Sequence, residues 1–255
     1  MTFTEEQDKI FDFMLHGIGN ARINAGAGCG KTSTLIEGAK RYVRTYKDKT
    51  VLMIAFNKSI AEELRAKIDK SDLSESDRQR ISVKTSHTLG YGIINQCYGE
   101  KEDAAIKVDE NKYRTHLMKI IEKASDGMYS QMDIDEQSRY VTSILRIFDF
   151  ARYYLCQTEK EMARIADKIC ISHPYNEIEI AFNMMDWGIA NLKSVDFTDM
   201  IWLPNVMRMD YRRFYDMVII DEAQDLSMAQ QELFKRFIRR RTGRFIAIGD
   251  RNQCI

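Results

Sequence analysis

Apolar residues in the first hundred positions form short continuous runs separated by helical stripes. The run VLMIAF is apolar at every position, which is typical of a strand buried on both faces of a parallel sheet. Helical spacing follows the first two runs, and an initial helix begins at Thr4, where Gln7 three residues later completes a capping box. The further elements predicted here are strands 21–25, 51–56 and 81–85 and helices 31–46 and 59–68.

The middle of the chain has a different pattern, with little strand signal and several helical stripes. Strand-length apolar runs resume afterwards, separated by one more helix. The predicted elements are helices 111–123, 135–154, 159–170, 177–192 and 228–240, and strands 217–221 and 244–249. Strands that alternate with helices predict an α/β fold with a parallel sheet and right-handed crossovers. We therefore expect a core of residues 1–98 and 195–255, interrupted by an all-helical insertion at 99–194.

Composition and charge narrow the class of protein without naming a function. The chain has 255 residues, 38 basic and 38 acidic, so it is not a globally basic nucleic-acid coat protein. Its five widely spaced cysteines indicate neither a zinc site nor a disulfide framework. No signal peptide and no apolar run of about 18 residues is present, so we expect a cytoplasmic protein that does not enter a membrane. The run Arg239–Arg241 could be a phosphate-binding patch, but we interpret it as a solvated helix end, where the helix dipole favours cations.

A glycine-rich segment between the first strand and the next helix indicates a phosphate site. Residues 25–32 (AGAGCGKT) match a P-loop in its structural context, although Ala25 stands where glycine is usual. Backbone N–H groups and the helix N-terminus would face the phosphates, Lys31 would reach the β- and γ-phosphates, and the Thr32 hydroxyl would bind Mg²⁺. The expected nucleotide-binding residues are Ala25, Gly26, Ala27, Gly28, Cys29, Gly30, Lys31, Thr32 and Ser33.

Two carboxylates end the apolar strand near residue 220. Asp221 would bind Mg²⁺, directly or through water, and Glu222 would act as the general base for an attacking water. These two residues could simply form a solvated acidic turn at the end of a strand. The P-loop in the same chain instead favours a nucleoside triphosphatase. These two motifs alone do not say which kind.

Further motifs resemble those of superfamily 1 helicases of the UvrD, PcrA and Rep type. Residues 221–225 (DEAQD) and 249–253 (GDRNQ) resemble motifs II and III of that family. The order and spacing of other segments agree: Gln7 with TEE before it resembles the Q motif, and AFNK, TSHTLG and DFTDM at 55–58, 85–90 and 196–200 resemble motifs Ia, Ib and Ic. Ala25 is also usual there, and the AFNK form is similar to the F-box-helicase branch.

This resemblance implies a RecA-like ATPase with a binding surface for single-stranded DNA. Gln7 would bind the adenine edge, and Gln253 would sense the γ-phosphate and act with Lys31 and Glu222 in catalysis. Phe56, Asn57, Lys58, Thr85 and His87 would contact single-stranded DNA. Ser86 stands where the family usually carries Phe, which removes one stacking surface. Alternatives remain: Phe56 could belong to the core, and His87 without its motif would be structural. Trp202 and Tyr211 could be either core residues or DNA contacts.

The resemblance also implies an ATP- and Mg²⁺-dependent DNA translocase or helicase that moves 3′ to 5′. The helical insertion would lie over the single strand and the duplex junction. The chain ends inside motif III, so we expect a second RecA-like domain to be missing and the chain alone to be nearly inactive. A bacterial protein of this kind would associate with the nucleoid, and a eukaryotic one would be nuclear. Two other classes stay open: a P-loop ATPase or kinase that binds no nucleic acid, and a helicase-like scaffold without turnover.

Overall fold

The computed structural model describes residues 3–26, 30–99 and 106–250. Two compact units divide the chain. One consists of residues 1–89, 211–226 and 234–255 and is called the sheet unit; the other consists of 90–210 and 227–233 and is called the helical unit. This division assigns residues 90–98 and 195–210 to the helical unit, whereas the sequence analysis assigned them to the core. The assignment of 99–194 as the insertion stays a prediction.

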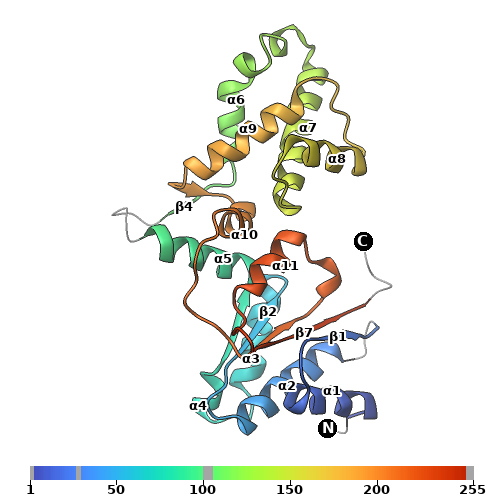
Figure 1. Cartoon of the computed structure of the whole chain (residues 1–255), viewed down its shortest axis with the longest axis vertical. Coiled ribbons are helices and arrows are strands. Elements are labelled where there is room, and N and C mark those ends of the chain that lie inside the picture. Colours follow the sequence, from blue (N-terminus) through green and yellow to red (C-terminus); the bar gives the residue numbers. More distant parts are fainter. Residues whose placement is uncertain (1–2, 27–29, 100–105, 251–255) are drawn as a thin grey trace. The chain divides into compact units, whose positions relative to one another are not determined.

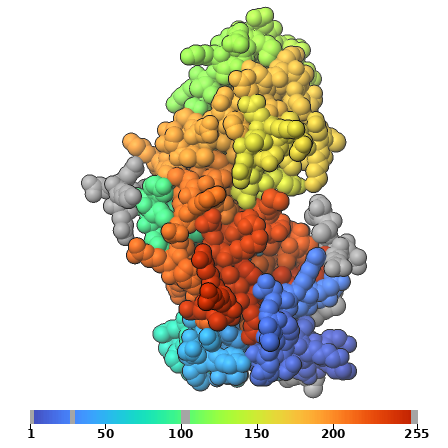
Figure 2. All heavy atoms as spheres, in the orientation of Figure 1, coloured from blue at the N-terminus to red at the C-terminus, as the bar shows by residue number. Residues whose placement is uncertain are grey.

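A five-stranded parallel sheet forms the sheet unit, which confirms the predicted fold class (Figure 1). Its order is β1-β7-β6-β2-β3, so the first and last strands of the chain are neighbours. In Figure 2 the two ends of the sequence accordingly share one surface, where blue and red atoms meet. The strands are β1 (Ala21–Asn24), β2 (Val51–Ala55), β3 (Ile81–Thr85), β6 (Met217–Ile220) and β7 (Arg244–Gly249).

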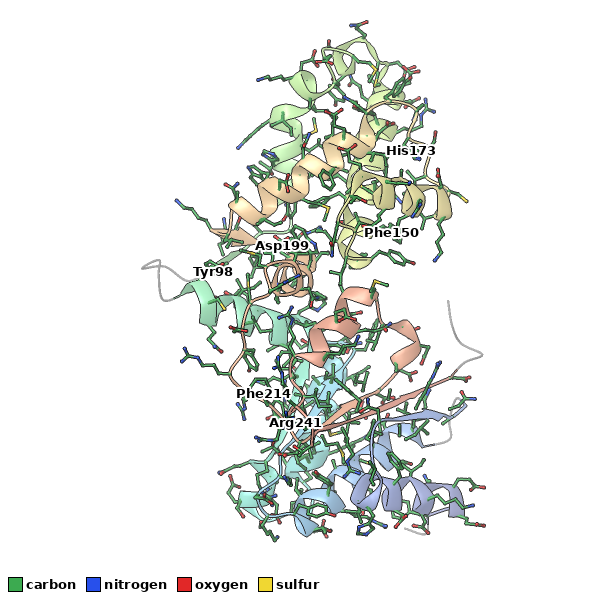
Figure 3. All side chains as sticks on the ribbon, viewed as in Figure 1. Tyr98, Phe150, His173, Asp199, Phe214 and Arg241 are labelled. Atoms are coloured by element: carbon green, nitrogen blue, oxygen red, sulfur yellow. The ribbon has the colours of Figure 1, made fainter. Side chains whose placement is uncertain are left out.

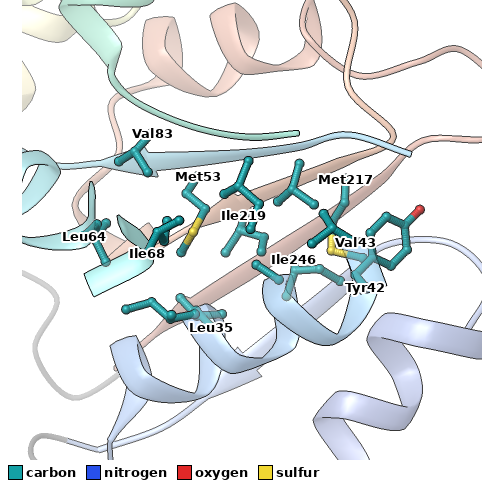
Figure 4. Packing of buried hydrophobic residues seen from close by; sticks show 14 of the residues in the cluster. Leu35, Tyr42, Val43, Met53, Leu64, Ile68, Val83, Met217, Ile219 and Ile246 are labelled. Atoms are coloured by element: carbon teal, nitrogen blue, oxygen red, sulfur yellow. The ribbon is translucent and has the colours of Figure 1, made fainter. Parts of the chain in front are cut away.

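Apolar residues of α2 pack against the sheet to make its core (Figure 4). Leu35 and Val43 are fully buried on this helix, and Ile219 and Ile246 meet them from the strands. The buried strands β2 and β6 carry no exposed position, as expected for strands covered on both faces. The helices of this unit are α1 (Glu5–His16), α2 (Lys31–Thr45), α3 (Lys58–Asp69) and α4 (Glu75–Arg78), with a 3₁₀ turn, η3 (Ala223–Asp225).

The α1 helix begins and ends with satisfied backbone groups. Thr4 and Gln7 form the predicted capping box, with reciprocal side-chain to backbone hydrogen bonds of 3.3 and 3.0 Å. At the other end, the Arg244 guanidinium on β7 donates to the carbonyls of Phe13, at 3.1 Å, and Met14, at 2.9 Å. These bonds satisfy carbonyls that the end of a helix leaves open, and they tie α1 to the sheet.

The helical unit contains the helices predicted from the middle of the chain. Helix α7 packs against α8 and α9, and α6 also contacts α9. Among the described residues, this unit also contains a two-residue strand pair, β4 (Lys107–Val108) with β5 (Ser194–Val195). Within the described residues, no helix is long and apolar enough to span a membrane. The helices are α5 (Ser86–Ile94), η1 (Asn95–Gly99, a π-helix), α6 (Lys112–Ala124), η2 (Tyr129–Gln131), α7 (Ile134–Tyr153), α8 (Glu159–Lys168), α9 (Glu177–Ala190) and α10 (Phe197–Val206).

The predicted helix 228–240 is wrong beyond its first half. Helix α11 (Met228–Lys235) ends early, because the chain turns and pairs with the segment before β6. Tyr215 donates to the carbonyl of Phe237 at 2.7 Å and accepts from the backbone N–H of Arg239 at 2.9 Å. Arg239 therefore does not sit at a helix C-terminus, and its side chain pairs with Asp216. The interpretation of Arg239–Arg241 as a solvated helix end is corrected accordingly.

Asp216 joins this segment to the loop before β2. Its carboxylate is 2% exposed. It accepts from the Thr50 backbone N–H at 3.0 Å, the Lys49 ammonium at 3.3 Å and the Arg239 guanidinium at 2.9 Å. Burial alone would raise the pKa of Asp216, but the Thr50 and Lys49 hydrogen bonds outweigh it and hold the pKa below its usual value. The carboxylate therefore stabilises the fold in its charged form.

Candidate nucleotide and nucleic-acid site

The candidate site residues follow the carboxyl ends of all five parallel strands. The P-loop follows β1, and Asp250 follows β7. Asp221, Phe56 and Thr85 follow or end β6, β2 and β3. Because the order is β1-β7-β6-β2-β3, the candidate nucleotide residues occupy three neighbouring strand ends and the candidate DNA residues the next two. Neighbouring strands lie about 4.8 Å apart, so this edge of the sheet is about 19 Å wide.

The glycine-rich turn of the P-loop ends at Gly30, which is the N-cap of α2. Gly30 has φ 71° and ψ 27°, a left-handed conformation that favours glycine. Ala25 extends the strand, since its N–H donates to the Gly249 carbonyl at 3.1 Å. Gly26 and Ser33 are exposed at this edge. The predicted contacts Ala27, Gly28 and Cys29 lie outside the described residues.

Thr32 and Asp221 meet at the expected metal position. The Thr32 hydroxyl donates to Asp221 Oδ2 at 2.9 Å, across 189 positions of sequence. Burial raises the pKa of Asp221, and the Thr32 hydrogen bond opposes that effect. Two hard oxygen donors about 2.9 Å apart match neighbouring ligands of an octahedron with metal–oxygen bonds of about 2.0–2.1 Å. The pair therefore fits Mg²⁺.

Lys31 and Glu222 form an ion pair at the same edge. The Lys31 ammonium lies 3.1 Å from Glu222 Oε2, and the lysine side chain is 9% exposed. Glu222 has φ 50°, so the chain turns sharply after Asp221, whose Oδ1 accepts the Glu222 N–H at 3.0 Å. A hydrogen bond from Gln224 is the main cause that lowers the pKa of Glu222, with a further contribution from Lys31. Glu222 is thus held as a carboxylate.

Gln224 is a connecting residue to which the sequence analysis gave no role. Its amide nitrogen donates to Glu222 Oε2 at 2.8 Å, while its amide oxygen accepts from the Asp250 N–H at 3.2 Å. A Cβ on Gly249 would lie 2.2 Å from that amide oxygen, so a side chain at position 249 would displace the Gln224 amide from this place. The side chain therefore links the turn after β6 to the end of β7. The predicted γ-phosphate sensor Gln253 lies outside the described residues.

Gln7 lies beside the P-loop, as the predicted adenine contact requires. Its amide nitrogen donates to Thr34 Oγ1 at 2.8 Å, and the Thr34 hydroxyl in turn donates to the Gly30 carbonyl at 3.0 Å. The Gln7 amide oxygen already accepts from the Thr4 N–H. Thr34 is thus a second residue that the sequence analysis missed. Its position on α2, three residues after Lys31, was the available signal.

Phe56, Asn57 and Lys58 form the loop from β2 into α3. Phe56 is 52% exposed, which argues against the core interpretation. The Asn57 side chain accepts from the Ile60 N–H at 2.9 Å and so caps α3. The Lys58 side chain is 88% exposed. The Lys58 ammonium lies 3.8 Å from Glu62 Oε1, so an exposed aromatic ring and a solvent-exposed ion pair stand together at this strand end.

Thr85 and His87 lie at the next strand end, because Ala55 is opposite Thr85 in the sheet register. Thr85 Oγ1 accepts from the Thr88 N–H at 3.2 Å, which caps the start of α5. Burial lowers the pKa of His87, so its imidazole is neutral at physiological pH. Ser86, which replaces the aromatic residue of the resemblance, is buried. Position 86 therefore offers no aromatic surface, whereas Phe56 at the neighbouring strand end is exposed.

Comparison with known proteins agrees with this geometry. The model of the UvrD/REP helicase N-terminal domain matches residues 4–255. The chain belongs to the UvrD/REP helicase family. "F-box DNA helicase 1" of Gallus gallus is 32% identical over 98 residues, which are 38% of this chain and 8% of that protein. "Probable DNA helicase II homolog" of Mycoplasma genitalium is 23% identical over 251 residues, which are 91% of this chain and 33% of that protein. The chain thus spans a third or less of these relatives.

In this UvrD/REP chain, the segment that resembles motif Ic has a structural role. Asp196 and Asp199 cap α10 reciprocally and are buried. The Arg152 guanidinium from α7 donates to Asp196 at 2.8 Å and to Asp199 at 2.9 Å (Figure 3 labels Asp199). Lys112 and Tyr113 from α6 donate to Asp199 at 2.9 and 2.6 Å. We call these five residues the buried charge cluster; it joins three helices of the helical unit.

Two aromatic residues left open by the sequence are now placed. Trp202 on α10 is fully buried in the helical unit, and its indole N–H has no partner among the described residues. Tyr211 packs edge-on against Phe237, with ring centroids 4.8 Å apart. The structure thus places Trp202 in the core, and Tyr211 makes an aromatic contact within the sheet unit.

Proposed function

We propose that this chain is the ATP-binding N-terminal part of an ATP-dependent DNA helicase or translocase. The observation that carries the proposal is the pairing of Lys31 with Glu222 and of Thr32 with Asp221 across two strand ends. Family membership supports DNA as the substrate. The chemistry required is in-line attack of water on the γ-phosphate of ATP.

Thr32 and Asp221 would hold Mg²⁺, directly or through a water molecule. When bound, Mg²⁺ supplies neutralisation of charge on the β- and γ-phosphate oxygens. The backbone N–H groups at the start of α2 would orient the phosphates, and the helix dipole would favour their negative charge. Gln7 would exchange one of its present hydrogen bonds for the adenine edge, and Gln253 would contact the γ-phosphate.

Lys31 and Glu222 would change partners when ATP binds. The Lys31 ammonium would turn from Glu222 to the β- and γ-phosphates, which carry more charge. Glu222 would keep its hydrogen bond from Gln224 and accept the proton of the attacking water. Until ATP binds, the ion pair with Lys31 would therefore keep Glu222 in its charged form. A phosphate group would then replace Glu222 as the partner of Lys31.

Single-stranded DNA would lie along the ends of β2 and β3. Phe56 would stack on a base, while Asn57, Lys58, Thr85 and His87 would contact the backbone. The helical segment 99–194 would lie near the strand and the duplex junction, as an insertion in a core of 1–98 and 195–255. Movement would be 3′ to 5′. The protein would act in the cytoplasm, at the nucleoid in a bacterium, or in the nucleus of a eukaryote.

Directional unwinding by the whole protein that contains this chain tests the proposal. Duplexes with a 3′ or a 5′ single-stranded tail should differ, and only the 3′-tailed duplex should separate with ATP and Mg²⁺. Separation of the 5′-tailed duplex alone would contradict the polarity, and separation of neither would contradict the helicase assignment. The 255-residue chain alone should hydrolyse ATP very slowly and unwind nothing. In the whole protein, a second RecA-like domain would supply arginines that raise the rate of hydrolysis by about 10³–10⁵.

A further inference from the structure

A cavity of about 420 Å³ lies in the helical unit, away from the residues discussed so far. Its walls are the N-terminal half of α7 and the segment that joins α8 to α9, on which Figure 3 labels His173. Ligand sites in proteins commonly occupy about 300–1,000 Å³. The cavity is therefore large enough for a small organic ligand or for one unit of a polymer.

Two guanidinium groups supply the cationic donors of the cavity. Arg139 and Arg146 both line it, and a spacing of seven residues places them on one face of α7, about 10 Å apart along the axis. Ser143 lies between them on the same face and also lines the cavity. Across the described parts of the chain, neither guanidinium has a hydrogen bond or an ion pair. Both are exposed and are available to an anion.

Glu136 and Glu177 also line the cavity, so its formal charges balance, but each carboxylate bonds a backbone N–H and neither forms an ion pair with Arg139 or Arg146. Glu136 Oε2 accepts from the Asp133 N–H at 3.2 Å in the capping box of α7. Glu177 is 2% exposed, and its Oε2 accepts from the Tyr175 N–H at 2.8 Å. Free cationic donors therefore face carboxylates that are already engaged with the backbone.

Tyr175 supplies a fixed aromatic surface at the same cavity. Its ring is 55% exposed, and its edge-to-face contact with Tyr140 has ring centroids 6.1 Å apart. The Tyr140 hydroxyl donates to Asn176 Oδ1, and the Asn176 amide nitrogen donates to the Ala124 carbonyl at 2.6 Å. Asn176, the residue after Tyr175, is thus anchored to the end of α6, and Tyr140 contacts the Tyr175 ring. The aromatic face is pre-organised before any ligand arrives.

We propose that this cavity binds a nucleotide, with the base stacked on Tyr175 and the phosphates held by Arg139 and Arg146. Guanidinium groups bind phosphate oxygens in pairs of hydrogen bonds, and tyrosine rings stack on any base. The nucleotide can be free in solution or can be one unit of a single strand. Only the second source rests on the proposed DNA-dependent function.

The test is calorimetric titration of the 255-residue chain carrying Lys31→Ala, which weakens the P-loop site. One arm uses ATP, and the other uses 5′-phosphorylated thymidine dinucleotide. Arg139→Ala with Arg146→Ala should weaken binding of the ligand about tenfold or more, since each charged hydrogen bond is worth a measurable factor. Alanine preserves the helix, so α7 should stay folded. Arg114→Ala, an exposed arginine on α6, is the matched control and should change nothing.

Stacking is tested separately with Tyr175. Tyr175→Ala should weaken binding about tenfold, whereas Tyr175→Phe should stay within about twofold. Binding of ATP supports a free nucleotide, and binding of the dinucleotide that ATP does not displace supports a strand. Photolabelling with 8-azido-ATP should mark the peptide containing Tyr175 in the first case. Failure of both ligands to bind, or binding that survives loss of both arginines, overturns the proposal and leaves the ATPase proposal untouched.

Discussion

Replacing Arg152 should destabilise the helical unit strongly. Its side chain is 1% exposed, and its guanidinium donates to Asp196, Asp199 and Asp149 at 2.6–2.9 Å. Burial and the neighbouring Asp196 charge raise the pKa of Asp199, while Arg152 and Lys112 oppose that effect. Arg152→Met keeps the aliphatic stem but leaves two buried carboxylates with one cation.

The size of the effect follows from this imbalance. Breaking one partner of a buried ion pair costs about 3–5 kcal/mol, because a buried charge is left uncompensated. We expect a loss of about 4 kcal/mol in the free energy of unfolding. With a urea dependence of about 2 kcal/mol/M, the midpoint should fall by about 2 M. The protein's two tryptophans, Trp187 and Trp202, both lie in the helical unit, so their fluorescence reports this transition selectively.

Two further variants make the measurement specific. Arg146→Met removes an exposed arginine from the same helix and should change the free energy of unfolding by less than about 0.5 kcal/mol. Arg152→Lys keeps the positive charge but lacks the planar guanidinium that bonds two carboxylates at once. It should therefore recover part of the lost free energy of unfolding. A midpoint for Arg152→Met within about 0.3 M of the parent would refute the role given to the buried charge cluster.

Three other variants probe the packing, the charge and the site. Gly90→Ala should destabilise the helical unit by about 1–3 kcal/mol, because its Cβ would lie 1.7 Å from the Met200 carbonyl oxygen. Gly92→Ala on the same helix meets nothing within 4 Å and should be neutral or stabilising, so equal urea midpoints for the two would contradict the packing. Asp216→Asn should cost about 2 kcal/mol at pH 7. The folded pKa of Asp216 is lowered, so its contribution is present above the unfolded value of about 3.9 and is lost as pH falls through the folded value. The difference between parent and variant in urea unfolding should therefore shrink below about pH 4, and a constant difference would count against this charge. Gln224→Ala should lower the kcat of the whole protein about tenfold with little change in KM for ATP, and an unchanged kcat would remove its positioning role.

Local signals were sufficient for the strands and most helices. Strands 81–85 and 244–249 match the structure residue for residue: the first alternates apolar and polar residues (ISVKT), and the second contains the apolar run FIAI. The helix 228–240 failed because its second half pairs with Tyr215, a contact that no local pattern contains. Helix α10 was missed as well, since all of its residues from 199 to 204 are buried and no polar face marks its period.

Some site residues were likewise predictable from local motifs, whereas other contacts depend on segments far apart in the sequence. The motifs predicted Lys31, Thr32, Asp221 and Glu222, which the fold brings within hydrogen-bond distance. The bridge made by Gln224 depends on the neighbouring ends of β6 and β7, which only the strand order supplies. The buried charge cluster joins three helices far apart in sequence, so the DFTDM segment alone could not show that its carboxylates face inward.

Steady-state ATP hydrolysis by the whole protein, with and without single-stranded DNA, tests the central claim most directly. The parent should be strongly stimulated by DNA. Glu222→Gln should bind ATP as tightly as the parent but lose turnover, because an amide cannot accept the proton from water. Lys31→Ala should lose turnover and bind ATP more weakly. Robust DNA-stimulated hydrolysis by the Glu222→Gln protein would contradict the account.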